Sequence, residues 1–361
     1  MTSSTTDLAT AYDSVSTCGA TAAAADTGTA FPSVTESTAG PARTGREMLR
    51  RLWEDGWGRN ELDLLPGLFA PTVAVLGHHA HLADQPPYGA DVVREEIGLF
   101  RGAFPDLTMR VSVSVTDGQW TLAAWEGRGT HTGPLLGLEP SGRTVHMAGA
   151  YLARVVDGRI TEARHTVDTL GYTQQVGAVP GAEEAPQGRP TGPADAPALP
   201  RGLDGAVPGP STPGDGEGRA LVRRLFDEVL GADGDIAALA GLLHPGRTVQ
   251  ENVGTTLPGG FELAAARHRT LLAAAPDARF RLEHLLVEGD LVGYGWSVTG
   301  THTGPLAGTK PTGRPFTFNG TSVSRVVDGR LADTLHRYDA LAIFDQIGRV
   351  PPAHGTLNIL G

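Results

Sequence analysis

The sequence predicts an α+β protein that contains two copies of one domain, each a curved antiparallel sheet with helices that enclose a pocket. The first observation is a long internal repeat, in which Gly129 to Pro180 aligns without a gap with Gly300 to Pro351. Roughly half of the aligned positions are identical, and the repeat is far too long for a solenoid. The second observation is the order of expected elements, because helices come first and hairpins follow in each copy. A chain of 361 residues suffices for two such domains.

Composition divides the chain into five segments. Residues 1–44 are rich in Ser, Thr and Ala and poor in large apolar residues, so we expect a disordered tail. The two domains are expected over 45–180 and 218–353. The Pro/Gly-rich linker 181–217 should be extended and long enough to let the domains dock beside each other. Residues 354–361 are expected to form a C-terminal tail.

Periodicity and turn residues predict the elements of the first domain. Helices are expected over 46–57, 60–69 and 90–104, with Asn60 as an N-cap of the second helix. Pro71 should end that helix before a short strand. The expected strands, some of them joined by Asp-Gly turns, are 72–76, 107–115, 120–129, 143–156 and 159–166. A short helix over 169–176 should close the domain.

The second domain repeats this order. Its expected helices are 219–230, 236–243 and 261–274. Its expected strands are 248–253, 279–287, 291–300, 314–327 and 331–337.

Charge and composition exclude several classes of function. A net charge of −11 and the lack of a basic stripe argue against a nucleic-acid partner. The single cysteine, Cys18, excludes an intrachain disulfide. The sequence has no run of about 20 apolar residues and no secretory signal pattern, so we expect no membrane partner and a cytoplasmic location. His78, His79 and His81 lack a cysteine or carboxylate partner at metal spacing, and we predict no metal and no cofactor.

The repeated motifs carry a family resemblance. The pattern G-T-H-T-G-P-L, followed by R-V-V-D-G-R and H-x-x-D, resembles the SnoaL-like polyketide cyclases of the nuclear-transport-factor-like cone fold. The resemblance covers each domain from its first helix to its last. It implies a small-molecule substrate similar to a polyketide intermediate, and a family that forms dimers. The two copies should therefore form an intrachain pseudo-dimer, or the chain a homo-oligomer.

The resemblance also implies site positions. In the family, a pocket Asp after the hairpin acts as acid/base, a His on the preceding strand assists it, and an Asn orients the substrate. The Asp position falls on His165 and His336, and the His position on Tyr151 and Ser322. The Asn position falls near Val75 in the first copy and between Val249 and Asn252 in the second.

The residues at these positions suggest their own chemistry. An imidazole is a natural general base at neutral pH, so His165 and His336 are the leading catalytic candidates, against the alternative of structural histidines. Asp168 and Asp339 are read either as groups that orient these imidazoles or, preferentially, as N-caps of the last helices. Tyr151 could donate to an enolate oxygen or simply line the pocket.

Other residues are candidates for substrate binding. His131 and His302 are expected to tie down a strand-to-loop bend. Aromatic residues form the pocket wall and core, and two polar residues of the second copy are expected to point into its pocket. These candidates are Trp53, Trp125, Trp296, Tyr294, Glu251 and Asn252.

Three functions remain open from the sequence. The first is a cofactor-free cyclase of polyketide-type secondary metabolism, in which a pocket histidine abstracts a proton before ring closure, with the first copy as the favoured catalyst. The second is an epoxide-opening cyclase or hydrolase. That chemistry needs paired carboxylates, for which the only candidates are Glu251 and Glu228. The third is a non-catalytic ligand-binding or scaffold protein.

Overall fold

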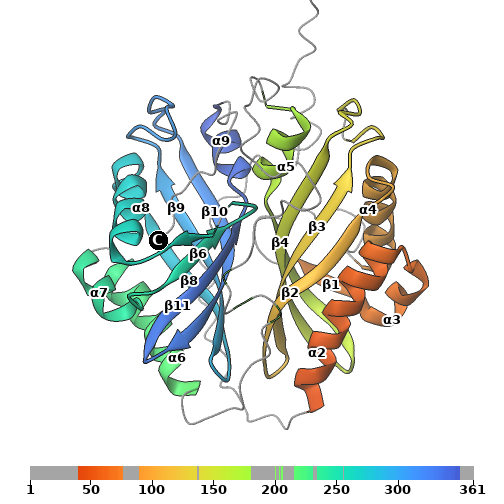
Figure 1. Ribbon diagram of the computed structural model, residues 1–361, viewed down its shortest axis with the longest axis horizontal. Coiled ribbons are helices and arrows are strands. Elements are labelled where there is room, and N and C mark those ends of the chain that lie inside the picture. The colour runs from red at the N-terminus through yellow and green to blue at the C-terminus, as the bar shows by residue number, and fades with distance from the viewer. Residues whose placement is uncertain are drawn as a thin grey trace, which may run out of the picture.

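The computed structural model describes residues 40–75, 89–135, 138–179, 215–230, 234–254 and 256–349, together with Pro200, Leu203 and Gly205. The chain forms two α+β halves whose sheets lie against each other in the middle of the molecule, with most helices on the outer sides (Figure 1). The predicted fold class is confirmed. Most of the expected tail and linker, and all of 354–361, lie outside the described residues.

The first half has a five-stranded sheet in the order β1-β5-β4-β3-β2. Its helices are α2 (Gly40–Arg50), the π-helix η1 (Arg51–Gly58), the 3₁₀-helix η2 (Leu62–Leu64), α3 (Leu65–Leu68), α4 (Ala90–Ala103) and α5 (Thr169–Val176). Its strands are β1 (Phe69–Val75), β2 (Thr108–Asp117), β3 (Trp120–Thr130), β4 (Thr144–Val156) and β5 (Arg159–Val167).

The second half has a six-stranded sheet in the order β7-β6-β11-β10-β9-β8. Its helices are α6 (Asp215–Arg224), the π-helix η5 (Leu225–Val229), the 3₁₀-helix η6 (Ile236–Ala238), α7 (Leu239–Leu242), α8 (Phe261–Ala274) and α9 (Leu341–Ile347). Its strands are β6 (Thr248–Glu251), β7 (Leu257–Pro258), β8 (Arg279–Glu288), β9 (Leu291–Thr301), β10 (Pro315–Val327) and β11 (Arg330–Tyr338).

The sequence analysis expected antiparallel sheets, but each sheet contains one parallel strand pair. β1 pairs with β5 in parallel, and β6 pairs with β11 in parallel. These strands are not joined by hairpins, so no turn signal in the sequence reports their pairing. Pro71 lies inside β1 instead of before it, which an edge strand tolerates because one side of its backbone needs no partner.

Two further local expectations are wrong. Asn60 does not cap a helix, because it adopts a φ of 63° and η2 begins only after Glu61. The expected tail ends early, since α2 already begins at Gly40. By contrast, the hairpin turn at Asp157 and Gly158 has positive φ at both residues, as its Asp-Gly sequence predicts.

An apolar layer joins the two sheets. Its buried residues come from β2, β3 and β4 of the first half and from β8 to β11 of the second, with Leu203 of the expected linker between them. Leu203 is fully buried, and the Gly205 N–H donates to the Ser112 carbonyl. This part of the expected linker is therefore packed against the first half.

Candidate functional site

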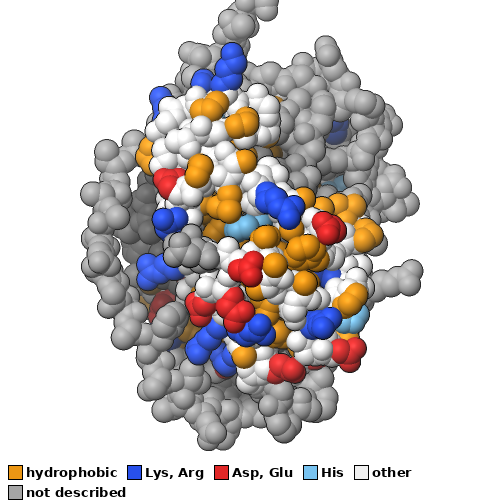
Figure 2. Space-filling model, turned by 90° about the vertical axis from the view of Figure 1, so that its left-hand side faces the viewer, with side chains coloured by type: hydrophobic (Ala, Val, Ile, Leu, Met, Phe, Trp, Pro, Cys, Tyr) orange, Lys and Arg blue, Asp and Glu red, His pale blue; other side chains and the backbone are white. Residues whose placement is uncertain are grey.

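A cavity lies in the second half, between the concave face of the sheet and the helices η5, α7 and α8. It leaves about 50 Å³ for the centres of water-sized molecules, which is room for a few waters. Leu, Phe and Ala make up eight of its fifteen lining residues. Hydrophobic side chains also gather on the outer face of this half (Figure 2). The polar residues that line the cavity are Arg247, His268, Tyr294, Trp296, Ser322, Thr334 and His336.

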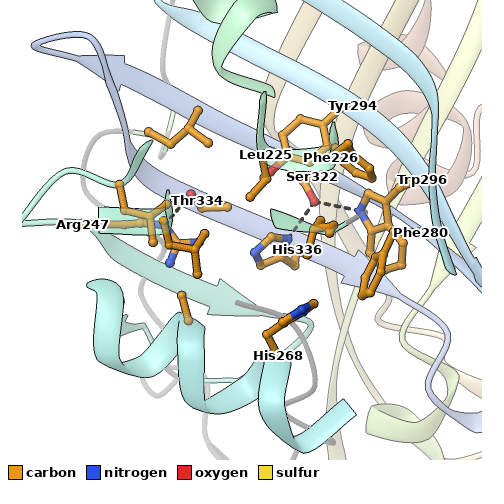
Figure 3. A pocket seen from close by; sticks show the side chains of 15 residues that line it. Leu225, Phe226, Arg247, His268, Phe280, Tyr294, Trp296, Ser322, Thr334 and His336 are labelled. Carbon is orange, nitrogen blue, oxygen red and sulfur yellow. Dashed lines mark hydrogen bonds between the residues drawn. The ribbon is translucent and has the colours of Figure 1, made fainter. Parts of the chain in front are cut away.

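Three of these side chains form a hydrogen-bonded chain. The Trp296 indole Nε1 donates to Ser322 Oγ at 2.9 Å, and Ser322 Oγ lies 2.7 Å from His336 Nδ1 (Figure 3). The sheet register explains the contact, because Ser322 on β10 pairs with His336 on β11 and with Tyr294 on β9. Side chains at paired positions lie on the same face of a sheet. The second ring nitrogen of His336 lies on the far side of the ring from Ser322.

The Trp296 indole restricts the hydrogen bonds that Ser322 can form. A tryptophan N–H can only donate, so Ser322 Oγ accepts from Trp296 and keeps one hydroxyl proton to give. When the Ser322 hydroxyl proton points away from the imidazole, His336 Nδ1–H donates to Ser322 and Nε2 is the basic nitrogen of the ring. Burial raises the pKa of Tyr294, while a hydrogen bond with Ser324, the Arg247 charge and a hydrogen bond with Ser322 act in the opposite direction.

His268 and Arg247 complete the polar lining. Burial lowers the pKa of His268, which is therefore neutral at pH 7. Arg247 donates from Nε to Thr334 Oγ1 at 3.1 Å and from Nη1 to the Gly259 carbonyl at 2.5 Å. Burial lowers its pKa to about 10, so it remains cationic at neutral pH.

The sequence analysis missed both residues. His268 lies on the buried face of α8 with Ala264 and Leu271, at the spacing of one helical stripe. A titratable residue on such a stripe is the signal that could have found it. Arg247 precedes β6 and carries no comparable pattern.

Glu251 and Asn252 were expected to point into the pocket, but the structure places neither among the lining residues. The buried Glu251 carboxylate accepts from Arg267 Nη1 at 2.5 Å and from the Tyr338 hydroxyl at 2.8 Å. Burial raises its pKa and the Arg267 charge opposes that rise. The Asn252 amide bonds the backbone N–H and carbonyl of Tyr338, each at 3.0 Å. Both residues thus brace the β6–β11 edge.

Aromatic rings pack together in the interior of the first half. Trp53 stacks on Trp125 with ring centroids 4.5 Å apart and on Trp57 at 5.5 Å, and it meets Tyr151 edge-on at 5.8 Å. His165 lies 5.0 Å from Trp53 and 5.6 Å from both Trp125 and Tyr151. The histidine that was favoured as the catalytic base is therefore packed within this aromatic cluster.

The repeat alignment explains the difference between the two interiors. Large rings of the first half are replaced by smaller groups in the second, which opens space. The pairs are Trp53 and Phe226, Trp57 and Leu230, and Tyr151 and Ser322. Two apolar residues are replaced by basic ones, which adds polar groups to a mainly apolar wall. These pairs are Ile97 and His268, and Val73 and Arg247.

Asp168 is the N-cap of α5, whereas Asp339 lies one residue before Ala340, the N-cap of α9, and both aspartates also join the two halves. Asp168 Oδ1 accepts from the Gly171 N–H at 2.8 Å, while its Oδ2 accepts from the Val253 N–H of the other half at 3.2 Å. Asp339 Oδ1 accepts from the Leu341 N–H at 3.1 Å and from the Thr169 hydroxyl of the first half. Neither aspartate lines the cavity.

Of the remaining histidines named in the sequence analysis, the structure describes His131 and His302. His131 Nδ1 lies 3.1 Å from Ser141 Oγ, and His302 Nδ1 lies 3.1 Å from Thr312 Oγ1, each across a strand-to-loop bend. His78, His79 and His81 lie outside the described residues. Within the described ranges, no group of three His, Cys, Asp or Glu side chains is arranged to hold a metal ion. None of the helices described there is long and apolar enough to cross a membrane.

The fold and the cavity define a protein with two cone-shaped α+β domains, one of which holds a small pocket with basic groups. The sequence profile of the SnoaL-like polyketide cyclase family matches residues 47–176 and 220–347. The chain therefore belongs to the SnoaL-like polyketide cyclase family and contains two copies of its domain. A comparison with curated protein sequences found no significant match.

Three similar solved structures each match less than half of this chain and most of their own length. A candidate SnoaL-like polyketide cyclase from Jannaschia sp. CCS1 is 28% identical, covers 40% of this chain and 99% of its own, and has a TM-score of 0.36. IdmH, a candidate polyketide cyclase from Streptomyces antibioticus, is 25% identical, with coverages of 36% and 97% and a TM-score of 0.32. AclR, a candidate hydroxylase from Streptomyces galilaeus, is 22% identical, with coverages of 42% and 87% and a TM-score of 0.34.

Proposed function

We propose that the second half is the catalytic half of a cofactor-free cyclase, with His336 as the general base that acts on an enolisable, polyketide-type substrate. The observation that supports this best is the hydrogen-bonded chain of Trp296, Ser322 and His336 at the wall of an apolar cavity. A hydrogen bond to Nδ1 fixes the orientation and tautomer of an imidazole whose Nε2 reacts.

The reaction needs only proton transfers and one carbon–carbon bond. His336 Nε2 removes a proton from a carbon between two carbonyl groups, and the enolate oxygen that forms is stabilised by the Tyr294 phenol and the Arg247 charge. The enolate carbon then attacks a second carbonyl carbon of the same substrate. The new alkoxide accepts a hydrogen bond from His268 and takes a proton back from the His336 imidazolium, which regenerates the base. Because the cavity has room for only a few waters, a substrate of this size must widen it on binding. Once the substrate is bound, the apolar walls favour ring closure by keeping water away.

The alternative of an epoxide-opening enzyme receives less support. That chemistry uses paired carboxylates, and none of the described residues that line the cavity is an Asp or Glu. Glu251 lies close by but is held by a buried arginine, and Glu228 pairs with Arg224 on the surface.

We infer a different role for the first half. Its aromatic interior around Trp53 suits a scaffold, and the apolar layer between the sheets suits an intrachain pseudo-dimer. This assignment replaces the expectation that His165 is the principal base.

Parallel substitutions of the two histidines test the proposal. The probe is ethyl 2-methylacetoacetate, whose acidic C–H exchanges with deuterium from D₂O and disappears from the proton NMR spectrum. His336→Gln should slow the protein-dependent exchange by about 10²- to 10⁴-fold, the usual effect of a general base. His165→Gln is the matched control and should change it less than about threefold. Equal losses in the two variants, or a greater loss in His165→Gln, would contradict the proposal.

A further inference from the structure

The contact between the halves contains ion pairs of two kinds. Arg46 pairs with Glu288 at 2.5 Å, and Arg219 pairs with Asp117. The repeat aligns Arg46 with Arg219 and Asp117 with Glu288, so this pair occurs twice, once on each side of an approximate two-fold axis. These pairs are what two identical subunits would make.

Two other ion pairs occur only once among the described residues. Arg337 Nη2 lies 3.7 Å from Glu126 Oε1, and Arg164 pairs with Glu283. The repeat gives each of these four residues an uncharged counterpart. The counterparts are Thr166 for Arg337, Ser297 for Glu126, Leu335 for Arg164 and Ser112 for Glu283. Each unrepeated pair has its arginine directly beside the histidine of its own half.

Arg337 holds the backbone around His336. Its side chain is 1% exposed and donates from Nη1 to the Asn252 carbonyl at 2.8 Å and to the His336 carbonyl at 3.2 Å. Its Nη2 donates to Gln250 Oε1 at 3.1 Å. The His336 carbonyl also accepts from the Asn252 N–H at 2.9 Å. The guanidinium therefore fixes the end of β6 against β11 directly behind the cavity.

The first half supplies the negative charges near this guanidinium. Burial lowers the Arg337 pKa to about 10, while the charges of Glu126 and Asp168 act in the opposite direction. Asp168 also accepts from the Val253 N–H, one residue after Asn252. Glu126 thus reaches across the interface to Arg337, and Asp168 reaches the segment whose Asn252 N–H bonds the His336 carbonyl.

We propose that the first half is a positioning partner of the second-half site, in which Glu126 holds Arg337, Asp168 holds the Val253 backbone N–H next to Asn252, and Arg337 fixes the backbone and the electrostatic environment of His336. This inference rests on the proposed role of His336. It assigns a function to a half in whose own interior aromatic rings pack together.

Several ionisable groups face His336 or Arg337. They come from α8, β9, the segment before β6, β6, β11 and the first half. These groups are His268, Arg267, Tyr294, Arg247, Glu251, Tyr338, Glu126 and Asp168. Of these, Glu126 is the most accessible to substitution, because its side chain is 22% exposed.

The decisive measurement is the titration of the His336 ring, followed by NMR of its Cε1–H and assigned with His336→Gln. Glu126→Gln removes a negative charge and should lower the His336 pKa. Arg337→Gln removes a positive charge and should raise it. Each shift should be about half a unit, which a unit charge roughly 10 Å away produces in a partly screened interior. A general loosening of the fold would not move the two variants in opposite directions.

Glu283→Gln is the matched control, because it breaks the other unrepeated pair, which lies beside His165. It should leave the His336 titration unchanged. In the deuterium-exchange assay, Glu126→Gln should lower kcat about three- to tenfold with KM unchanged, and Glu126→Asp should restore most of the loss. The readouts also separate this inference from the proposed function. If exchange does not depend on His336 but the shifts appear, the positioning holds and the catalytic role fails.

Several results would overturn the inference. The first is an unchanged His336 pKa in Glu126→Gln. The second is a His336 pKa that shifts in the same direction in Glu126→Gln and Arg337→Gln. The third is a His336 pKa shift in Glu283→Gln as large as that in Glu126→Gln. If Arg337→Gln does not fold, the other two variants still test the inference. It requires the His336 pKa to fall in Glu126→Gln and to stay unchanged in Glu283→Gln.

Discussion

Tyr151→Ser should destabilise the first half strongly, because it removes a buried aromatic ring. The second copy has serine at the equivalent position, Ser322. Tyr151 is 2% exposed, and its ring lies 5.8 Å from that of Trp53 and 5.6 Å from that of His165. Truncation of a buried aromatic ring costs about 3–5 kcal/mol through lost burial and the cavity left behind. The loss of aromatic pairs adds to this within the same range. We therefore expect the free energy of unfolding to fall by about 3–5 kcal/mol.

Urea unfolding followed by tryptophan fluorescence measures this effect. Four of the five tryptophans lie in the first half, so the signal reports mainly on that half. With an m-value of about 3 kcal/mol/M, the unfolding midpoint should fall by about 1–2 M. Tyr151→Phe is the control, since it keeps the ring, and should cost no more than about 1 kcal/mol. The reasoning is refuted if the serine variant loses less than about 1 kcal/mol, or no more than the phenylalanine variant.

Three more predictions concern the second half and the interface. Ser322→Ala leaves the Trp296 N–H and His336 Nδ1 without their shared partner, which should cost about 1–3 kcal/mol in urea unfolding and slow deuterium exchange about tenfold. Glu251→Gln leaves a buried arginine without its carboxylate and should cost about 3–5 kcal/mol, read by thermal and urea unfolding. Burial lowers the pKa of His284 from 6.5 to about 4, so its neutral form stabilises the fold above pH 6.5 and this contribution is lost as pH falls toward 4. His284→Gln should flatten the fall of the urea midpoint over that range.

Each of these has a contrary outcome. Full exchange activity in Ser322→Ala would show that the serine does not orient His336. A stable Glu251→Gln variant would mean that the carboxylate does not compensate its arginine partner. The same pH dependence with and without His284 would assign the acid sensitivity to other groups.

Much of the fold could be predicted because its signals are local. Helical spacing gave the bounds Thr169–Val176 and Phe261–Ala274 that the structure has. Asp-Gly pairs gave the hairpins. The parallel edge strands β1 and β6 could not be predicted in this way, because their partners lie far along the chain and no turn joins them.

The location of the cavity also could not be read from single positions. His165 and His336 are equivalent in the repeat, so the sequence alone gave no physical reason to prefer the second. The difference is the volume of side chains that meet only in the folded chain, such as Trp53 and Tyr151 in the first half and Ser322 in the second. The N-cap reading of Asp168 did follow from local sequence, whereas its bond across to the other half did not.

The unrepeated ion pairs have a genetic consequence. In a dimer of identical subunits, one codon change alters both sides of the symmetry axis at once, so a change that suits one side must be tolerated on the other. Fusion of the two copies removes this constraint, and Arg337 could arise opposite Glu126 while the equivalent spot kept Thr166 and Ser297. The duplication thus allowed one gene to evolve an unequal pair of domains.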